Sequence, residues 1–433
     1  MSWQFETDPE FQTELDWVAD FVEAELAPLD HVIDSPYDLR DPVRRALIPP
    51  LQQQVRERGL WGCHLGPNLG GPGYGQVKLG LLNEILGTAK SAPTVFGCQA
   101  PDSGNSEILA HYGTAEQKQR FLEPLLRNEM VSCFSMTEPQ GGADPKVFTC
   151  RAEPDGDEWV INGEKWFSSN ARYADFFITM VVTDPDNPPY QRMSMFLVPS
   201  NTPGITIKRN VALGYQADRE GSHAYLAYQD VRVPAENMLG DRGGAFIVAQ
   251  TRLGGGRIHH AMRTVGQVRK AFDMLCERAV SRHTQGEMLG RKQMVQDMVA
   301  QSWIDIECFR LLVLQTAWKI DRYQDYKRVR KDIAAVKALM PKVFHDVASR
   351  ALQIHGSLGV SNEMPFAAMV IESFHMGLAD GPTEVHKATL ARLALSGYTP
   401  APGLFPTQPG LTLRDQARQR CAELLEAQVL DQA

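Results

Sequence analysis

The first part of the chain carries a helical pattern of apolar and polar positions. Near the N-terminus, apolar residues fall three or four positions apart and form one stripe: Phe11, Leu15, Val18, Phe21 or Val22, and Leu26. Asp8 is placed to cap this helix, and Pro9 fits its first position. Thr114 and Gln117 form a capping box before a second apolar run. We expect an all-helical N-terminal domain over residues 1–131.

The pattern then changes to short runs rich in β-branched and aromatic residues. These runs cover residues 159–167, 176–183, 193–199, 205–207 and 224–234. Asn-Gly, Asp-Pro and Pro-Gly turns separate the runs, which is typical of sheets whose neighbouring strands are joined by short loops. We expect a central antiparallel β-barrel or sandwich over residues 132–244.

A helical pattern returns in the last third of the chain. Pro341 lies inside one helical stretch, so a kink or a helix boundary is expected there. A linker rich in Pro and Gly follows, and residues 412–430 can form one amphipathic tail helix. We expect a C-terminal helical bundle over residues 245–396 and a linker with a tail helix over residues 397–433.

This order of elements predicts an α+β fold, because strands are segregated from helices and do not alternate with them. No G-x-G-x-x-G motif follows a strand, so a doubly wound dinucleotide-binding sheet has no support. The chain also has no G-x-S-x-G motif, and none of its Cys and His residues has metal-ligand spacing. We therefore expect no metal site and no nucleophilic serine.

Charge and cysteine content narrow the function classes further. The 433 residues carry a formal net charge of −8 without a basic stripe, which argues against nucleic-acid binding. Seven cysteines without paired spacing indicate reduced thiols. The acidic N-terminus has no leader pattern, and no apolar run approaches the ~20 residues of a membrane span. We expect a cytoplasmic protein.

Four segments carry a family likeness. They are CFSMTEPQGGADP (133–145), INGEKWFSSN (161–170), SRHTQGEMLGRKQ (281–293) and the pair ALQIHGSLGVSNEMPF (351–366) with ADGPTEVHKATLARL (379–393). In this order the segments resemble the acyl-CoA dehydrogenase family over roughly residues 10–396. The A-D-G-P-T-E-V-H form is similar to the branch containing members 10 and 11 of the human family, without their fused kinase-like part.

The resemblance implies an N-terminal helical domain, a central β-domain and a C-terminal four-helix bundle. It also implies FAD as cofactor, an acyl-CoA substrate, a homodimer or homotetramer, and an electron-transfer flavoprotein as partner. The implied reaction forms a trans-2-enoyl-CoA: a carboxylate removes the α-proton, and the flavin N5 accepts the β-hydride. An acyl-CoA oxidase or flavin monooxygenase of the same fold, and a non-catalytic module that binds flavin or acyl-CoA, remain open alternatives.

For the catalytic base, the resemblance indicates Asp380. The family's commonest catalytic Glu falls on Asp380, and its alternative position falls on Gly256, which has no carboxylate. Asp380 could instead only cap a helix or shape the D-G-P turn. Burial near the flavin should raise the pKa of the base, and Arg257, which matches a family Arg near the base, could restrain that rise or form a structural ion pair. The family's oxyanion donors would be the Asp380 N–H and a flavin hydroxyl.

For the cofactor, the resemblance implies two groups of contacts. The flavin ring would meet Phe134, Met136, Thr137, Gly142, Ala143, Phe167, Ser169 and Pro382. The FAD diphosphate and adenosine would meet Arg282, Thr284, Gln285, Gln353, Gly356, Ser357 and Glu384, mostly from a neighbouring subunit. Phe167 replaces the Trp that often stacks on the ring. Ala143 replaces a common Ser that contacts the ligand, so that hydrogen bond is absent or replaced here. His259, His260 and His355 are interpreted as structural histidines.

Overall fold

The computed structural model describes residues 6–214, 216, 221–400, 409–424 and 426. Its internal contacts divide the chain into two units, Met1–Lys387 and Ala388–Ala433. All the site residues discussed below lie in the first unit.

The N-terminal part of the first unit is helical, as expected. Its α-helices are α1 (Pro9–Phe21), α2 (Pro42–Glu57), α3 (Gly75–Leu86), α4 (Ala92–Val95), α5 (Asp102–Tyr112), α6 (Ala115–Gln117) and α7 (Glu123–Leu126). The Asp8 side chain accepts a hydrogen bond of 2.9 Å from the Phe11 N–H, and the stripe predicted for α1 is buried. The predicted capping box of Thr114 and Gln117 is also present.

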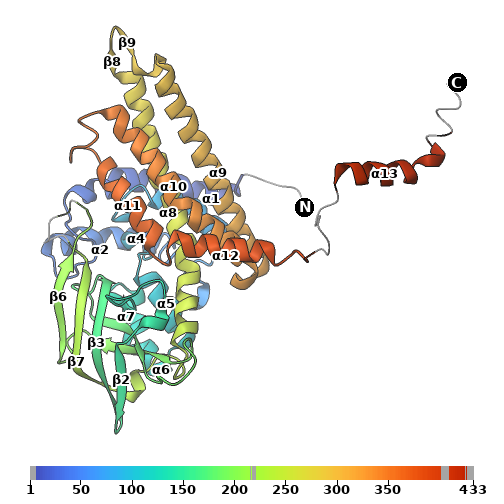
Figure 1. Cartoon of the computed structure of the whole chain (residues 1–433). Helices are drawn as coiled ribbons and strands as arrows, with labels where there is room; N and C mark the ends of the chain where they lie inside the picture. The colour runs from blue at the N-terminus through green and yellow to red at the C-terminus, as the bar shows by residue number, and fades with distance from the viewer. Residues whose placement is uncertain (1–5, 215, 217–220, 401–408, 425, 427–433) are drawn as a thin grey trace. The chain divides into compact units, whose positions relative to one another are not determined.

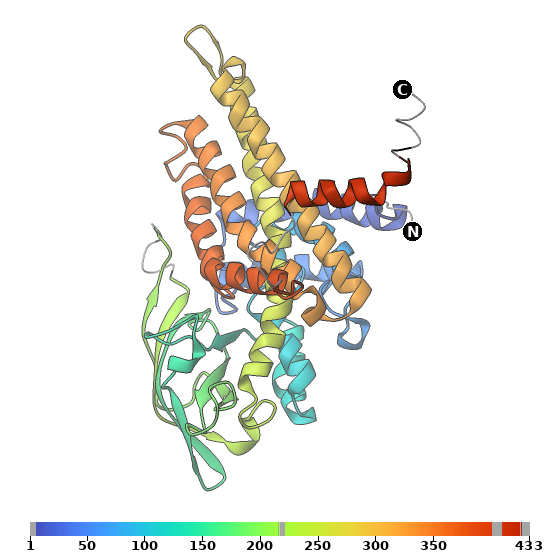
Figure 2. The same cartoon turned by 45° about the vertical axis from the view of Figure 1, so that its right-hand side comes forward.

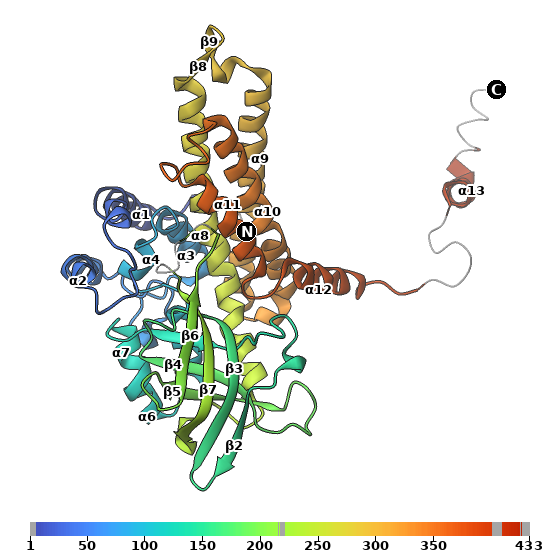
Figure 3. The same cartoon turned by 60° about the vertical axis from the view of Figure 1, so that its left-hand side comes forward.

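A seven-stranded sheet follows. Its strands are β1 (Ser132–Ser135), β2 (Arg151–Asp155), β3 (Glu158–Ser169), β4 (Phe176–Val182), β5 (Met193–Pro199), β6 (Ile205–Val211) and β7 (His223–Pro234). The order is β1-β4-β2-β3-β7-β6, with β5 paired to β4 (Figure 3). Most pairs are antiparallel, as expected, but β1 and β2 each pair with β4 in parallel. The β1–β4 pairing places Phe134 beside Ile178.

The C-terminal bundle consists of three long helices, α8 (Ala245–Ser281), α9 (Gln293–Tyr323) and α10 (Tyr326–His355), and the shorter α11 (Phe366–Leu378). Helix α10 packs against the other three, and α8 also packs against α3 and α5. A small hairpin, β8 (His283–Thr284) and β9 (Glu287–Met288), joins α8 to α9 at the end of the bundle remote from the sheet (Figure 1). Helix α8 is long enough to run from that hairpin down alongside the sheet (Figure 2).

The helix boundary considered at Pro341 is wrong, because α10 continues through it. Proline removes one backbone donor, and the ring occupies space beside the preceding turn. Here Pro341 faces Gly377 of α11, where an added Cβ would lie 3.3 Å from the Pro341 Cβ. The proline ring therefore lies where α10 and α11 approach each other closely.

The chain continues into α12 (Thr383–Leu395), and α13 (Gly410–Arg420) belongs to the second unit. The predicted tail helix is therefore confirmed up to Arg420, and the end of the predicted range lies outside the described residues. All seven cysteines are free thiols. No helix in the described part of the chain combines the length and the apolar character that a membrane span requires.

Candidate active site

Asp380 lies in the turn between α11 and α12, in a left-handed conformation with φ of 56°. Such a conformation costs a residue with a side chain about 1–3 kcal/mol and persists only where the surroundings impose it. Two side chains hold the Asp380 carbonyl oxygen: Arg257 donates to it from Nε over 3.0 Å, and His386 Nε2 lies 3.3 Å away. The structure thus joins Asp380 and Arg257, the two residues expected to form the catalytic centre.

The Asp380 carboxylate rests against α8. A Cβ placed on Gly256 would lie 3.2 Å from Asp380 Oδ2, so the glycine leaves room for the carboxylate. His260 Nε2 lies 3.6 Å from Oδ2, and an Arg252 terminal nitrogen lies 3.9 Å from Oδ1. Because Arg252, Gly256 and His260 are four residues apart, they share one face of the helix. The two family positions for the base, Asp380 and Gly256, therefore meet at one point in space.

The pKa of Asp380 is lowered, which makes the expected upward shift wrong. Burial alone would raise this pKa, but His260, Arg252, Lys337 and Arg257 lower it together and outweigh burial. Burial lowers the pKa of His260 to about 3, so His260 is neutral near pH 7. The positive charges that remain near the carboxylate at neutral pH are thus those of Arg252, Lys337 and Arg257.

Lys337 is an unexpected member of this group. Its side chain on α10 is buried, and its ammonium donates to the Met376 carbonyl at the end of α11. Burial lowers the Lys337 pKa to about 8 although Asp380 favours the charged form. The residue therefore fixes α11 just ahead of Asp380 and places a positive charge in the site.

The residues expected along the flavin ring come together at the end of the sheet near this centre. Strand β1 brings Phe134 there, and the Trp166 N–H donates to the Thr137 carbonyl over 2.8 Å, which ties the segment after β1 to β3. Phe167 has φ of 55° and stacks on His223 at 4.4 Å between ring centroids. His223 in turn is hydrogen-bonded to Ser169 over 2.9 Å.

These residues fit a flavin. Half-buried hydroxyls of Thr137 and Ser169 can each donate and accept at a polar ring edge, and half-buried Phe134, Met136 and Phe167 supply apolar and aromatic surface. These five residues are called the flavin wall below. A Cβ on Gly142 would approach the Thr137 methyl to 3.4 Å, so the turn that carries Gly142 and Ala143 lies close against the flavin wall. Pro382 immediately precedes α12 and lies two residues after Asp380.

The residues expected at the FAD diphosphate and adenosine lie elsewhere in the chain. Arg282, Thr284 and Gln285 are in or beside the β8–β9 hairpin, whereas Gln353, Gly356 and Ser357 mark the end of α10. Roughly 25 residues of α8 separate Gly256 from this hairpin, which corresponds to about 38 Å of helix. One chain therefore does not bring the hairpin to its own flavin wall. Glu384 is exposed in the first turn of α12.

Sequence reasoning missed Arg252, His260 and Lys337. The first two could have been found by stepping four residues either way from Gly256 along the predicted helix. Lys337 stands among buried apolar residues of α10, where a lysine is out of pattern. The structural roles expected for His259 and His355 agree with their contacts: His259 pairs with Gln76 over 3.1 Å, and His355 Nδ1 donates to the Ala351 carbonyl over 2.7 Å.

Comparison with known proteins identifies the family. Three family models match the chain. They are described as "Acyl-CoA dehydrogenase, N-terminal domain" (residues 8–129), "Acyl-CoA dehydrogenase, middle domain" (133–231) and "Acyl-CoA dehydrogenase, C-terminal domain" (243–395). Acyl-CoA dehydrogenase family member 11 of Gallus gallus is 40% identical over 356 residues, which are 80% of this chain and 45% of that protein. The chain thus spans about half the length of the curated relatives in that group.

This chain matches two further relatives over nearly the whole length of each. A protein of Mycobacterium tuberculosis named probable acyl-CoA dehydrogenase FadE2 is 38% identical over 85% of this chain and 92% of its own. The solved structure of butyryl-CoA dehydrogenase from Megasphaera elsdenii is 27% identical, with a TM-score of 0.77, over 91% of this chain and 100% of its own. The matches and the geometry of the flavin wall support FAD as the cofactor, and the chain belongs to the acyl-CoA dehydrogenase family.

Proposed function

We propose that the protein removes two hydrogens from the Cα–Cβ bond of an acyl-CoA thioester and forms a trans-2-enoyl-CoA, with Asp380 as the base. The observation that carries the proposal is the position of the Asp380 carboxylate. It lies at the point where the two base positions of the family converge. Arg252 links it to the ring of Phe134, because the guanidinium lies 3.9 Å from Asp380 Oδ1 and 4.1 Å from the centroid of that ring. Family membership supports flavin-dependent acyl-CoA dehydrogenation in general; the base and the product are part of the proposal.

The surroundings of Asp380 suit this role although Asp is one methylene shorter than Glu. The carbonyl anchored by Arg257 and the left-handed backbone aim the short side chain at α8. Asp380 accepts the α-proton on its carboxylate, which the nearby cations keep ionised before the reaction. The Asp380 N–H is proposed to donate to the thioester oxygen, a contact typically worth ~3–4 kcal/mol in the transition state. When bound, FAD supplies the acceptor for the β-hydride.

Self-association is part of the proposal. Helix α9 exposes Ile304, Leu311 and Trp318 at seven-residue spacing, with Trp303 beside them, at 38–53% of their accessible surface. Large apolar side chains repeated on one helix face favour a protein contact. We propose that this face meets a second copy in a dimer or tetramer, and that Arg282 and Gln353 serve the FAD of a neighbouring subunit. Light scattering of wild type and of a Trp303→Glu variant tests the interface; an unchanged mass would contradict it.

An electron-transfer flavoprotein is the proposed electron acceptor, because the family resemblance implies it. The competing acceptor is oxygen, which would make the protein an oxidase or a monooxygenase. Stopped-flow mixing of the reduced protein with air-saturated buffer separates the two: slow reoxidation supports the proposal, and complete reoxidation within seconds opposes it.

The direct test of the reaction is anaerobic bleaching of the flavin by straight, branched and hydroxylated acyl-CoAs. Wild type should be yellow and should bleach with at least one of them. Asp380→Asn should retain FAD and ligand binding but reduce the flavin about 100- to 10,000-fold more slowly, because it has lost its base. Equal rates for the two proteins would remove Asp380 from the mechanism.

A further inference from the structure

Arg252 stands at the centre of a contact chain that runs from Asp380 into the N-terminal helices. One terminal nitrogen lies 3.9 Å from Asp380 Oδ1, and Nε donates to Asn105 Oδ1 over 2.7 Å. The guanidinium also covers the Phe134 ring at 4.1 Å from its centroid. With only 12% of its side chain exposed, Arg252 touches the base, the flavin wall and α5 at once.

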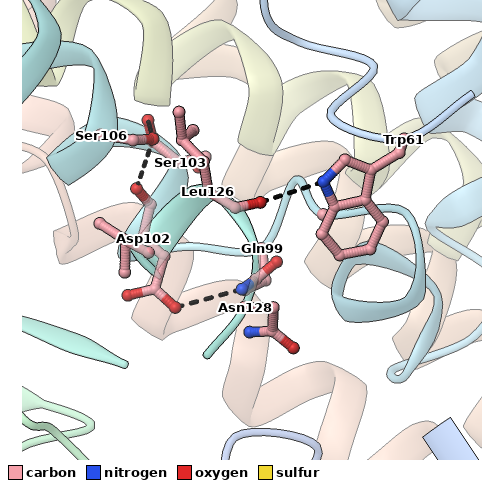
Figure 4. A pocket seen from close by; sticks show the side chains of 9 residues that line it. Trp61, Gln99, Asp102, Ser103, Ser106, Leu126 and Asn128 are labelled. Atoms are coloured by element: carbon pink, nitrogen blue, oxygen red, sulfur yellow. Dashed lines mark hydrogen bonds between the residues drawn. The ribbon is translucent and has the colours of Figure 1, made fainter. Parts of the chain in front are cut away.

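Hydrogen bonds to Ser132 and, through it, to Asp102 fix the side chain of Asn105. Its amide Nδ2 donates to Ser132 Oγ over 2.8 Å, and Ser132 donates from Oγ and from its backbone N–H to Asp102 Oδ1 over 2.6 and 2.8 Å. Gln99 donates to the other Asp102 oxygen over 3.1 Å beside a cavity of about 10 Å³, room for about one water (Figure 4). Asn105, Ser132 and Asp102 are 0–3% exposed.

The direction of every bond in this chain is fixed. The Asp102 carboxylate accepts, so the Ser132 hydroxyl donates to it and accepts from the Asn105 amide. The Asn105 carbonyl must then point the other way, towards Arg252 Nε. An arginine side chain otherwise has roughly 2 kcal/mol of rotamer entropy available, and the bond from Arg252 Nε to the Asn105 carbonyl restricts that freedom.

We infer that Asn105 is a positioning residue for the proposed dehydrogenation: through Arg252 it aims a guanidinium that holds the Asp380 carboxylate in its reactive place. The inference rests on the proposed function. Asn105 touches neither the base nor the expected substrate position, and its effect passes through Arg252. Arg252 acts on the side chain of Asp380, whereas the hydrogen bond from Arg257 fixes only the Asp380 backbone.

Other charged and titratable groups face this pair from each packed element. Arg257 and His260 come from α8, Lys337 from α10 and His386 from α12. On the far side of Arg252, burial raises the pKa of Glu107 on α5 to about 7, and Arg252 is the cation that opposes this rise. Arg252 has a hydrogen bond to Asn105 and none to Glu107 in the described residues, so its geometry follows the amide.

Space around Arg252 supplies an independent variant. A Cβ on Gly104 would lie 3.1 Å from Arg252 Cγ, so Gly104→Ala shifts the stem by a few tenths of an ångström while every hydrogen-bonding residue remains. Asn105→Leu removes the acceptor at similar volume. Arg252→Lys keeps a positive charge but loses the Nε donor and the planar fork. Ser106→Ala is the control on the same helix, because Ser106 Oγ donates only to backbone carbonyls of its own helix.

The experiment measures FAD content, acyl-CoA affinity from the flavin spectrum, the anaerobic flavin-reduction rate and its pH profile. Asn105→Leu should reduce the flavin about 10- to 100-fold more slowly, as expected for a base displaced by up to ~1 Å, with affinity changed less than ~3-fold. Gly104→Ala should be slower in the same sense, and Ser106→Ala should match wild type. Arg252→Lys should be slow but keep the acid limb of the profile, because its charge remains.

The outcomes separate the inference from the function on which it rests. If wild type bleaches and both Asn105→Leu and Gly104→Ala react at the wild-type rate, the inference is overturned and the proposed function stands. If wild type does not bleach with any acyl-CoA, the proposed function falls. A crystal structure of FAD-loaded Asn105→Leu then decides the positioning alone: a displaced Arg252 side chain supports it, and an unmoved one overturns it.

Discussion

Adding one methyl group to Gly256 should separate stability from activity. In the middle of a helix, Gly→Ala stabilises by roughly 0.5–1 kcal/mol, since alanine loses less backbone entropy on folding. The new Cβ would, however, stand 3.2 Å from Asp380 Oδ2, closer than ordinary van der Waals contact. The carboxylate must retreat by a few tenths of an ångström. A misplacement of ~1 Å costs ~100-fold in rate, so this retreat should cost about 3- to 10-fold.

The matched control is Gly254→Ala, two residues earlier on the same helix. Its Cβ would meet the Tyr326 ring at 3.6 Å, an ordinary contact, and would not approach Asp380. Both variants should gain similar stability in chemical denaturation, and only Gly256→Ala should slow anaerobic flavin reduction. Equal reduction rates in the two variants would refute the placement of the Asp380 carboxylate against α8.

Two further outcomes follow from buried charges. Lys337→Met removes a cation that lowers the pKa of Asp380, so the pKa of Asp380 should rise. The base is then protonated up to a higher pH, and the acid limb of the profile of reduction rate against pH should move to higher pH. An unmoved limb would show that Lys337 has no electrostatic role. Lys165 and Glu138 form an ion pair of 2.8 Å with 0% and 1% exposure, and Lys165→Met leaves the buried carboxylate without this cation, although the Thr149 and Cys150 N–H groups still donate to it. Denaturation should therefore show a loss of about 3–5 kcal/mol, and a loss below ~1 kcal/mol would contradict the burial of this pair.

Local patterns predicted local structure well. The Asp8 cap and the stripe from Phe11 follow from hydrogen-bonding capacity and helical period, which act within a few residues. Strand β2 had no such signal, because Pro154 and three charged residues interrupt the alternation of apolar and polar positions that is typical of a strand; its pairing with β3 and β4 is a tertiary effect. Pro341 was misleading because α10 continues through it, with the ring packed against Gly377 of α11, a contact that the local sequence does not reveal.

The site shows the same division. Motif register predicted Asp380 and Arg257, which the structure joins. The pKa direction could not be predicted, because it depends on cations from α8 and α10 that only folding brings together. Arg252 in particular gains its position from Asn105, which lies 147 residues away in sequence. Hydrogen bonds across such separations leave no periodic trace in a chain.

The length of α8 has a genetic consequence. If the hairpin at its far end serves a neighbouring copy, each reaction centre draws one half of its cofactor contacts from one polypeptide and the rest from another. Two inactive alleles, Asp380→Asn and Arg282→Ala, should then rescue each other when co-expressed, because a mixed pair can assemble one centre with both halves intact. Co-purified hybrids carrying two different affinity tags would regain part of the wild-type flavin reduction, whereas mixing the separately purified proteins without subunit exchange would not.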